Sequence, residues 1–207
     1  MQKAQSSLLK GLVAGVVLAA LLSLLLVLFV AYTGAYNIAA SQDHSPFVRW
    51  VFSTTMQNSV SARAGDLEVP AEFSETQIAA GAGHYKAMCQ HCHAGPGVER
   101  AEWARGLLPQ PPHLVEEAAH WQPNEVFWLV KHGVRMSAMP AFGETHGDAE
   151  LWDIAAFVKQ LPGMTASEYA ALGGVRFENR GHGRRFPVMS SGYRSAGLAP
   201  GLSATLD

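Results

Sequence analysis

This chain has few cysteines and no dense cluster of basic residues, and both features limit the classes of function that it can have. Only two of its 207 residues are cysteines, Cys89 and Cys92. It also lacks a dense basic face. Residues 74–173 hold six Lys and Arg against eleven Asp and Glu, and the arginines of residues 174–207 are scattered among glycines and serines. We therefore expect no nucleic-acid partner, because nucleic acids are bound by clustered basic side chains.

The sequence is also short of strand patterns, because no segment alternates apolar and polar residues convincingly. Helical patterns are present instead, and they predict an all-α fold. We expect one helix from Ser74 that ends at a loop around Cys89, and a second from an N-cap at Asn124 to Gly133. The strongest pattern predicts a third helix, which Asp148 caps and Pro162 ends.

Charged residues are missing from one long stretch, Gly11 to Tyr32, in which Ser23 is the main polar interruption. An apolar helix of this length covers the ~30 Å hydrocarbon core of a bilayer. A cleaved signal peptide is the alternative, but its apolar region is typically ~7–15 residues, and the chain offers no clear small-residue cleavage site here. The sequence therefore predicts a retained membrane anchor.

The charges that flank the apolar stretch predict its orientation. Lys3 and Lys10 precede it, whereas the first charges after it are Asp43 and Arg49. The positive-inside rule then puts the N-terminus in the cytoplasm and everything after Tyr36 outside. For a bacterial chain, this means an inner-membrane protein with a single span and a periplasmic main domain.

We divide the chain into four parts: a cytoplasmic N-terminus with the anchor (1–36), an amphipathic helical stalk and linker (37–73), a compact domain (74–172) and a flexible Gly/Arg-rich tail (173–207). A Ser-Pro pair at Ser45 predicts the start of the stalk helix, which lies near the membrane or against the next domain. A simple spacer and a partner-binding helix both remain open for this segment.

The two cysteines stand in the run "CQHCH", which ends at His93. Cys-x-x-Cys-His is the motif for covalent haem attachment: the thiols form thioether bonds, and the imidazole binds the iron. A thioredoxin-like redox pair would need a βαβ pattern that the sequence lacks. A zinc site built from these cysteines and two of the histidines is the other alternative.

A haem needs a second axial ligand or leaves one face open. The candidate ligands are Met136, Met139, His120, His132 and Met88. We favour Met139, because it stands in an irregular loop between two predicted helices and is followed by Pro140, which fixes the backbone. If the second face is open instead, the chain is a haem enzyme or a gas sensor.

These residues resemble the class I cytochromes c, over about half of the chain, 74–172. The resemblance rests on "CQHCH", on "GVRMSAMPAFG", and on Gly81 and Tyr85 at the family's offsets before the first haem cysteine. It implies that Gly81 and Tyr85 cross the last helix of the domain at Trp152 and Phe157. It also implies that the carbonyl of Pro112 accepts the ring N–H of His93.

The resemblance, together with the anchor, implies a membrane-anchored monohaem cytochrome of a bacterial respiratory chain. Such a protein carries single electrons, either as a shuttle or as the haem subunit of a larger oxidoreductase. It is not itself an enzyme. We expect one covalent haem c, with His93 and Met139 as iron ligands. The expected partners are the bilayer and a membrane-bound redox enzyme or terminal oxidase, with no small-molecule substrate. The expected lining of the haem pocket is Leu107, Leu108, Leu114, Phe127, Val130 and Phe142.

Overall fold

The structure is a computed structural model that describes residues 2–172, with side chains described from residue 8 onward. The predicted tail, 173–207, lies outside the described residues. The helices are α1 (Gln2–Thr33), α2 (Pro46–Ala64), α3 (Glu75–His84), α4 (Gln90–His93), α5 (Leu114–Glu117), α6 (Pro123–His132), α7 (Asp148–Val158) and α8 (Ala166–Ala171). The described part contains no β-strand, only one isolated bridge between Gly95 and Val98, which confirms the all-α prediction.

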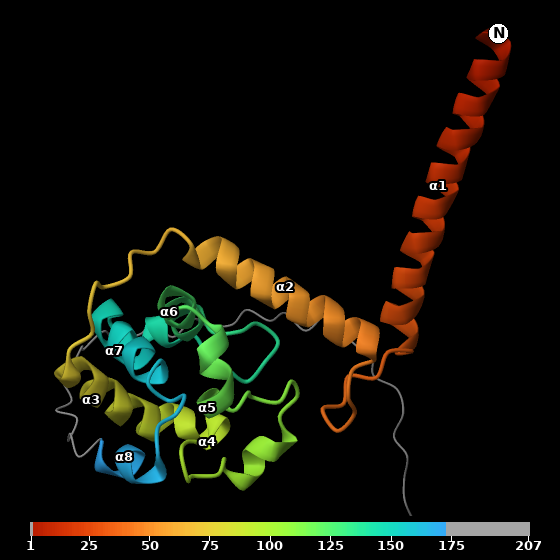
Figure 1. Cartoon of the computed structure of the whole chain (residues 1–207). Helices are drawn as coiled ribbons and strands as arrows, with labels where there is room; N and C mark the ends of the chain where they lie inside the picture. The colour runs from red at the N-terminus through yellow and green to blue at the C-terminus, as the bar shows by residue number, and fades with distance from the viewer. Residues whose placement is uncertain (1, 173–207) are drawn as a thin grey trace, which may run out of the picture. The chain divides into compact units, whose positions relative to one another are not determined.

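α1 is the long apolar helix that the sequence predicts (Figure 1). Within the described residues, it is the one helix long and apolar enough to cross a membrane, over Leu8–Thr33. Its apolar side chains are exposed along this length, which suits contact with lipid. By length and composition the segment fits a membrane span, and a signal sequence near the N-terminus has the same features.

α2 begins where the Ser-Pro pair predicts. The hydroxyl of Ser45 accepts a hydrogen bond from the backbone N–H of Val48 at 3.4 Å, and Pro46 occupies the first helical position. At the other end of α2, Val60 and Ala64 are fully buried. The C-terminal half of the stalk helix is therefore a packed element, and not a free spacer.

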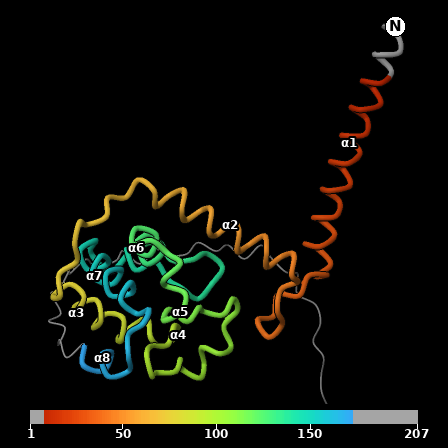
Figure 2. Tube along the Cα trace, viewed as in Figure 1, coloured from red at the N-terminus to blue at the C-terminus, as the bar shows by residue number. Residues whose placement is uncertain are grey.

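The core of the domain is the crossing of α3 and α7, which lie side by side in Figures 1 and 2. Gly81 makes this close approach. A Cβ at position 81 would lie 1.9 Å from the carbonyl oxygen of Asp153 and 2.9 Å from the Cβ of Phe157. Tyr85 and Phe157, both fully buried, pack with ring centroids 5.3 Å apart.

Several helix ends differ from the predictions. The first helix of the domain does not stop at Cys89, because a π-helical turn, Tyr85–Cys89, carries it into α4. α6 is capped by Gln122, whose backbone N–H donates to the Glu125 carboxylate at 2.9 Å, and not by Asn124. In the same way, the N-cap residue of α7 is Gly147, and not Asp148.

Candidate functional site

Cys89, Cys92 and His93 lie at the end of one continuous helical segment. The π-helical turn widens the helix at Cys89, where the backbone N–H of Gln90 reaches back to the carbonyl of Tyr85. α4 then carries the remaining residues of the motif and ends at Ala94, whose φ of 62° breaks the helix. Both thiols are thus held on neighbouring turns, with the imidazole directly after them.

Two tyrosines fix this segment from opposite ends of the domain sequence. The buried Tyr85 donates its hydroxyl hydrogen to the carbonyl of Ala94 at 2.8 Å, just after His93. The hydroxyl of Tyr169, on α8, donates to the side-chain oxygen of Gln90 at 2.9 Å. The motif is therefore fastened inside α4 and directly after it.

The ring of His93 is oriented by a backbone contact. Its Nδ1 lies 2.9 Å from the carbonyl oxygen of Pro112, as the resemblance implies. A carbonyl can only accept, so Nδ1 carries the hydrogen and Nε2 keeps the lone pair that a metal would need. Burial lowers the pKa of His93, the hydrogen bond to Pro112 raises it in part, and the nearby Arg100 lowers it again. The neutral imidazole is thus the favoured form.

The two cysteines are free thiols in the structure and are half-buried. Burial raises the pKa of Cys89 to about 12, with a smaller contribution from Cys92. Cys89 also packs against the hydrophobic core. A thiol in this setting is a poor thiolate nucleophile, which argues against a thiol-disulfide exchange site.

Met139 lies on a loop that is closed on itself. Gly133 ends α6 with a φ of 65°, and a Cβ there would lie 2.7 Å from the carbonyl oxygen of Met139. That carbonyl accepts a hydrogen bond from the backbone N–H of Val134 at 3.2 Å. The backbone N–H of Met139 donates to the hydroxyl of Ser137, also at 3.2 Å. The side chain of Met139 is half-buried against the core.

The other candidate ligands lie in different surroundings. Met136 is 82% exposed. His120 is exposed and lies 3.9 Å from the carboxylate of Glu117, and the exposed His132 packs on the ring of Trp128. Met88 packs against the core, inside the π-helical turn. Among the five, only Met139 combines contact with the core and a position on a fixed loop.

The segment that holds these residues matches one known family. The model of the family described as cytochrome c oxidase, cbb3-type, subunit III matches residues 76–158. This part of the chain is a c-type cytochrome domain. A domain of this type binds haem c covalently. The match covers less than half of the chain and includes the motif, the Pro112 contact and Met139. A search of curated proteins finds no match to the chain.

The donor set of the cytochrome c domain suits haem c. Two thiols stand three residues apart on one helical segment, an imidazole has its Nε2 lone pair free, and a thioether lies on a fixed loop. The predicted lining residues also take apolar positions: Phe127 and Val130 are buried in the core, Leu114 and Phe142 pack against it, and Leu107 and Leu108 are half-buried. The residues present therefore fit the group that the family binds.

One predicted contact is only half right. Phe157 does meet Gly81 and Tyr85, but Trp152 packs elsewhere. Its ring stacks on Phe127 with centroids 4.2 Å apart and planes 17° from parallel, and Phe73 lies on it at 6.2 Å. Trp152 thus joins α7 to α6, because it stands more than one helical turn before Phe157 and on a different face of α7.

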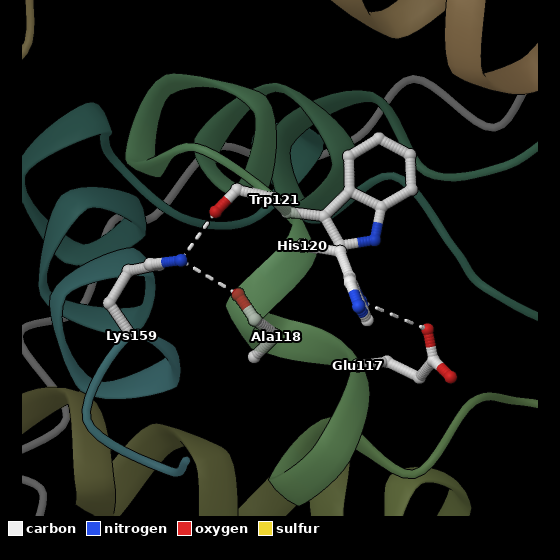
Figure 3. A network of polar contacts seen from close by, with 5 residues as sticks. All are labelled: Glu117, Ala118, His120, Trp121 and Lys159. Carbon is white, nitrogen blue, oxygen red and sulfur yellow. Dashed lines mark hydrogen bonds and ion pairs between the residues drawn. The ribbon is translucent and has the colours of Figure 1, made fainter.

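The segment that follows Pro112 is held in place by hydrogen bonds from Lys159. Figure 3 shows Lys159, at the end of α7, reaching the carbonyl oxygens of Ala118 and Trp121. The distance to Ala118 is 2.7 Å. Burial lowers the pKa of Lys159. An ammonium group therefore joins α7 to residues 118–121 of the chain that leads from Pro112 to α6.

An open groove of about 610 Å³ lies beside Pro112. Its lining is Glu99, Arg100, Arg105, Gln110, Pro111, Pro112, His113, Glu116 and Glu117. Most of these side chains are charged or polar, so the groove does not suit an apolar macrocycle. The apolar alternative is the core cluster that contains Phe127 and against which Met139 packs.

Sequence reasoning missed α8 and its contribution to the site. Tyr169 is buried and contacts the ring of Tyr85. Lys86 donates to the carbonyls of Tyr169 and Leu172, which ties α8 to the turn that holds Cys89. A signal was present: Thr165 and Glu168 have the spacing of a capping box, and the structure forms one there.

Proposed function

We propose that the chain is a membrane-anchored, monohaem electron carrier, with its haem c attached through Cys89 and Cys92 and its iron bound by His93 and Met139. The observation that carries this proposal is the match of the cytochrome family over the segment that contains all four residues. When bound, haem c supplies an iron that alternates between Fe(III) and Fe(II) by one electron.

The chain's own residues have three tasks in this proposal. Pro112 keeps the hydrogen of His93 on Nδ1, so that Nε2 is available and the ring cannot rotate freely. The loop at Gly133 presents the thioether of Met139, a soft donor that favours the reduced state. Phe127, Val130 and their neighbours exclude water, which favours Fe(II) over the more highly charged Fe(III).

If His93 and Met139 both bind the iron, no position is left for oxygen or a substrate, and the protein would act as a carrier and not as an enzyme. The same domain type occurs in an oxidase subunit, as the name of the matching family states. A membrane-bound redox enzyme or terminal oxidase is therefore the partner we propose, either as a separate complex or as the assembly to which the chain belongs. The acidic composition of residues 74–173 would steer a basic docking face towards it.

The membrane location is part of the proposal. We infer that α1 anchors the chain in the bacterial inner membrane, with the N-terminus in the cytoplasm and the cytochrome c domain in the periplasm. Its length, its exposed apolar side chains and the placement of Lys3 and Lys10 before it support this. Anchoring confines the domain near the membrane and raises its effective concentration towards membrane partners.

The test is a pair of variants, Met139→Ala and Met136→Ala, in the haem-loaded protein. Met139→Ala should abolish the far-red sulfur-to-iron absorption band, lower the reduction potential and open the iron to carbon monoxide. Met136→Ala should leave all three unchanged, because its side chain is 82% exposed.

Persistence of the far-red band in Met139→Ala would contradict the ligand assignment. Prompt binding of carbon monoxide by the unaltered reduced protein would instead indicate an open haem face and favour an enzyme or a gas sensor.

A further inference from the structure

The first turns of α2 present two large aromatic side chains to solvent. Phe47 is 69% exposed and Trp50 is 62% exposed, and their ring centroids lie 6.0 Å apart. We call this pair the aromatic face of α2. Contiguous exposed side chains of this size mark a binding surface more often than scattered ones do.

The aromatic face is separated from the surface by which α2 meets the domain mainly along the helix axis. Trp50 and Val60 are ten residues apart, which is about 15 Å of helix. Around the axis, at about 100° per residue, Trp50 lies only about 40° from Ala64, whereas Phe47 lies about 100° from it. Hydrogen bonds to the domain lie in the C-terminal half of the helix. There Ser61 donates to Glu125 at 2.5 Å and Asn124 donates to the carbonyl of Ala64 at 2.8 Å.

A closed loop holds the start of α2 beside the end of α1. The hydroxyl of Tyr36 and Nδ1 of His44 form a hydrogen bond of 2.7 Å, and the two rings are stacked. Within the loop, Asn37 donates to the side chain of Gln42 at 2.8 Å. The segment from residue 34 to 45 would reach about 40 Å if extended. Because it is closed, the helix begins close to Tyr36, three residues beyond the end of α1.

The position of the aromatic face, close to the end of α1, favours lipid as its binding partner. Trp and Tyr gather at the level of the lipid headgroups, and Trp, Phe and Leu form the buried face of helices that lie in that layer. If α1 ends at the membrane surface, that layer is the first medium that Phe47 and Trp50 meet. The one basic side chain between them, Arg49, lies 3.8 Å from Asp43, so an electrostatic partner is less well suited.

We propose that the first two turns of α2 lie in the headgroup layer of the bilayer, with Phe47 and Trp50 inserted towards the acyl chains. This inference rests on the proposed anchor. Since the other end of α2 is bonded to α6, the insertion would restrict the motion of the cytochrome c domain at the membrane. The domain would then meet its redox partners from a limited set of orientations.

The experiment uses the full-length haem-loaded protein in liposomes of phosphatidylcholine and phosphatidylglycerol. A nitroxide is placed at one introduced cysteine per variant: Phe47→Cys, Trp50→Cys, Arg63→Cys as the control on the last turn of α2, and Leu21→Cys as the control within α1. Cys89 and Cys92 take no label when both hold haem. Electron paramagnetic resonance then compares collisions with oxygen, which enters the bilayer, and with a water-soluble nickel chelate.

We expect oxygen to dominate at positions 47, 50 and 21, and nickel to dominate at position 63. Nickel dominance at 47 and 50 with oxygen dominance at 21 would overturn the inference while leaving the anchor intact. Low access of both reagents at 47 and 50 would also overturn it, because the face would then be covered by protein. Nickel dominance at position 21 would remove the anchor and this inference with it.

Discussion

At the scale of single residues, the cytochrome c domain depends on one contact at His93 and on one at Gly81. His93 is oriented by one carbonyl, that of Pro112, at 2.9 Å. Gly81 lets α3 approach the backbone of α7 so closely that any side chain would collide with Asp153. The first contact fixes the tautomer of the imidazole, and the second fixes the position of the helical segment that leads to Cys89 and Cys92.

Gly81→Ala tests this close approach. The added methyl group would lie 1.9 Å from a backbone oxygen, so the helices must separate, and we expect a loss of about 3 kcal/mol or more in the free energy of unfolding. Urea unfolding followed by circular dichroism measures it. Gly106→Ala is the matched control, because a Cβ at position 106 would have no atom within 4 Å and the expected change is below about 0.5 kcal/mol. Equal losses in the two variants would contradict the account.

At the scale of elements, the domain is held by lysines that reach backbone carbonyls across helices. Lys86 joins the π-helical turn to α8, and Lys159 joins α7 to residues 118–121 (Figure 3). Both side chains are partly buried, and burial lowers the pKa of each. Such bonds, made by a charged donor, are worth more than those between neutral groups.

Lys159→Met tests how much the hydrogen bonds of Lys159 contribute to the free energy of unfolding. Its removal leaves the carbonyls of Ala118 and Trp121 without their donor, and we expect a loss of about 2–3 kcal/mol in the free energy of unfolding. Hydrogen exchange should also become faster in residues 114–121. Lys131→Met is the control. Lys131 forms a surface ion pair with Asp148 at 2.7 Å, which is worth about 1 kcal/mol or less. The same exchange pattern in both variants would argue against this contribution.

Patterns in the sequence predicted the helices better than their ends. The apolar stripe of α7 and the Ser-Pro start of α2 were sufficient to predict these helices, because an apolar stripe and an N-cap are both formed by residues close together in the sequence. The π-helical turn at Cys89 was missed, because its contacts are with α7 and α8, which are far away in sequence, and no local pattern marks it. Met139 stays a prediction as an iron ligand. Its loop explains the preference, since Gly133 and Ser137 hold it while Met136 is exposed.

At the scale of the whole molecule, the long apolar helix α1, the stalk helix α2 and the cytochrome c domain follow one another along the chain. The stalk was expected either near the membrane or against the domain. Its C-terminal half lies against α6, and its N-terminal half carries the aromatic face. We infer that the two ends of α2 serve different contacts, which a single hydrophobic stripe in the sequence could not reveal.

Extraction of membranes tests the anchor. Alkaline carbonate removes peripheral proteins, so the chain should stay with the membrane if α1 spans it. The intact mass of the purified chain should include α1. Release by carbonate, together with a mass that lacks α1, would contradict the anchor and favour a cleaved signal peptide.

The most direct measurement of the central claim is the mass of the denatured protein after treatment with acid and organic solvent, which extracts haem that is not covalently bound. We predict that one haem per chain stays attached, and that Cys89→Ser with Cys92→Ser abolishes the attachment. A chain that gives up its haem under these conditions, or that contains zinc in its place, would contradict the account.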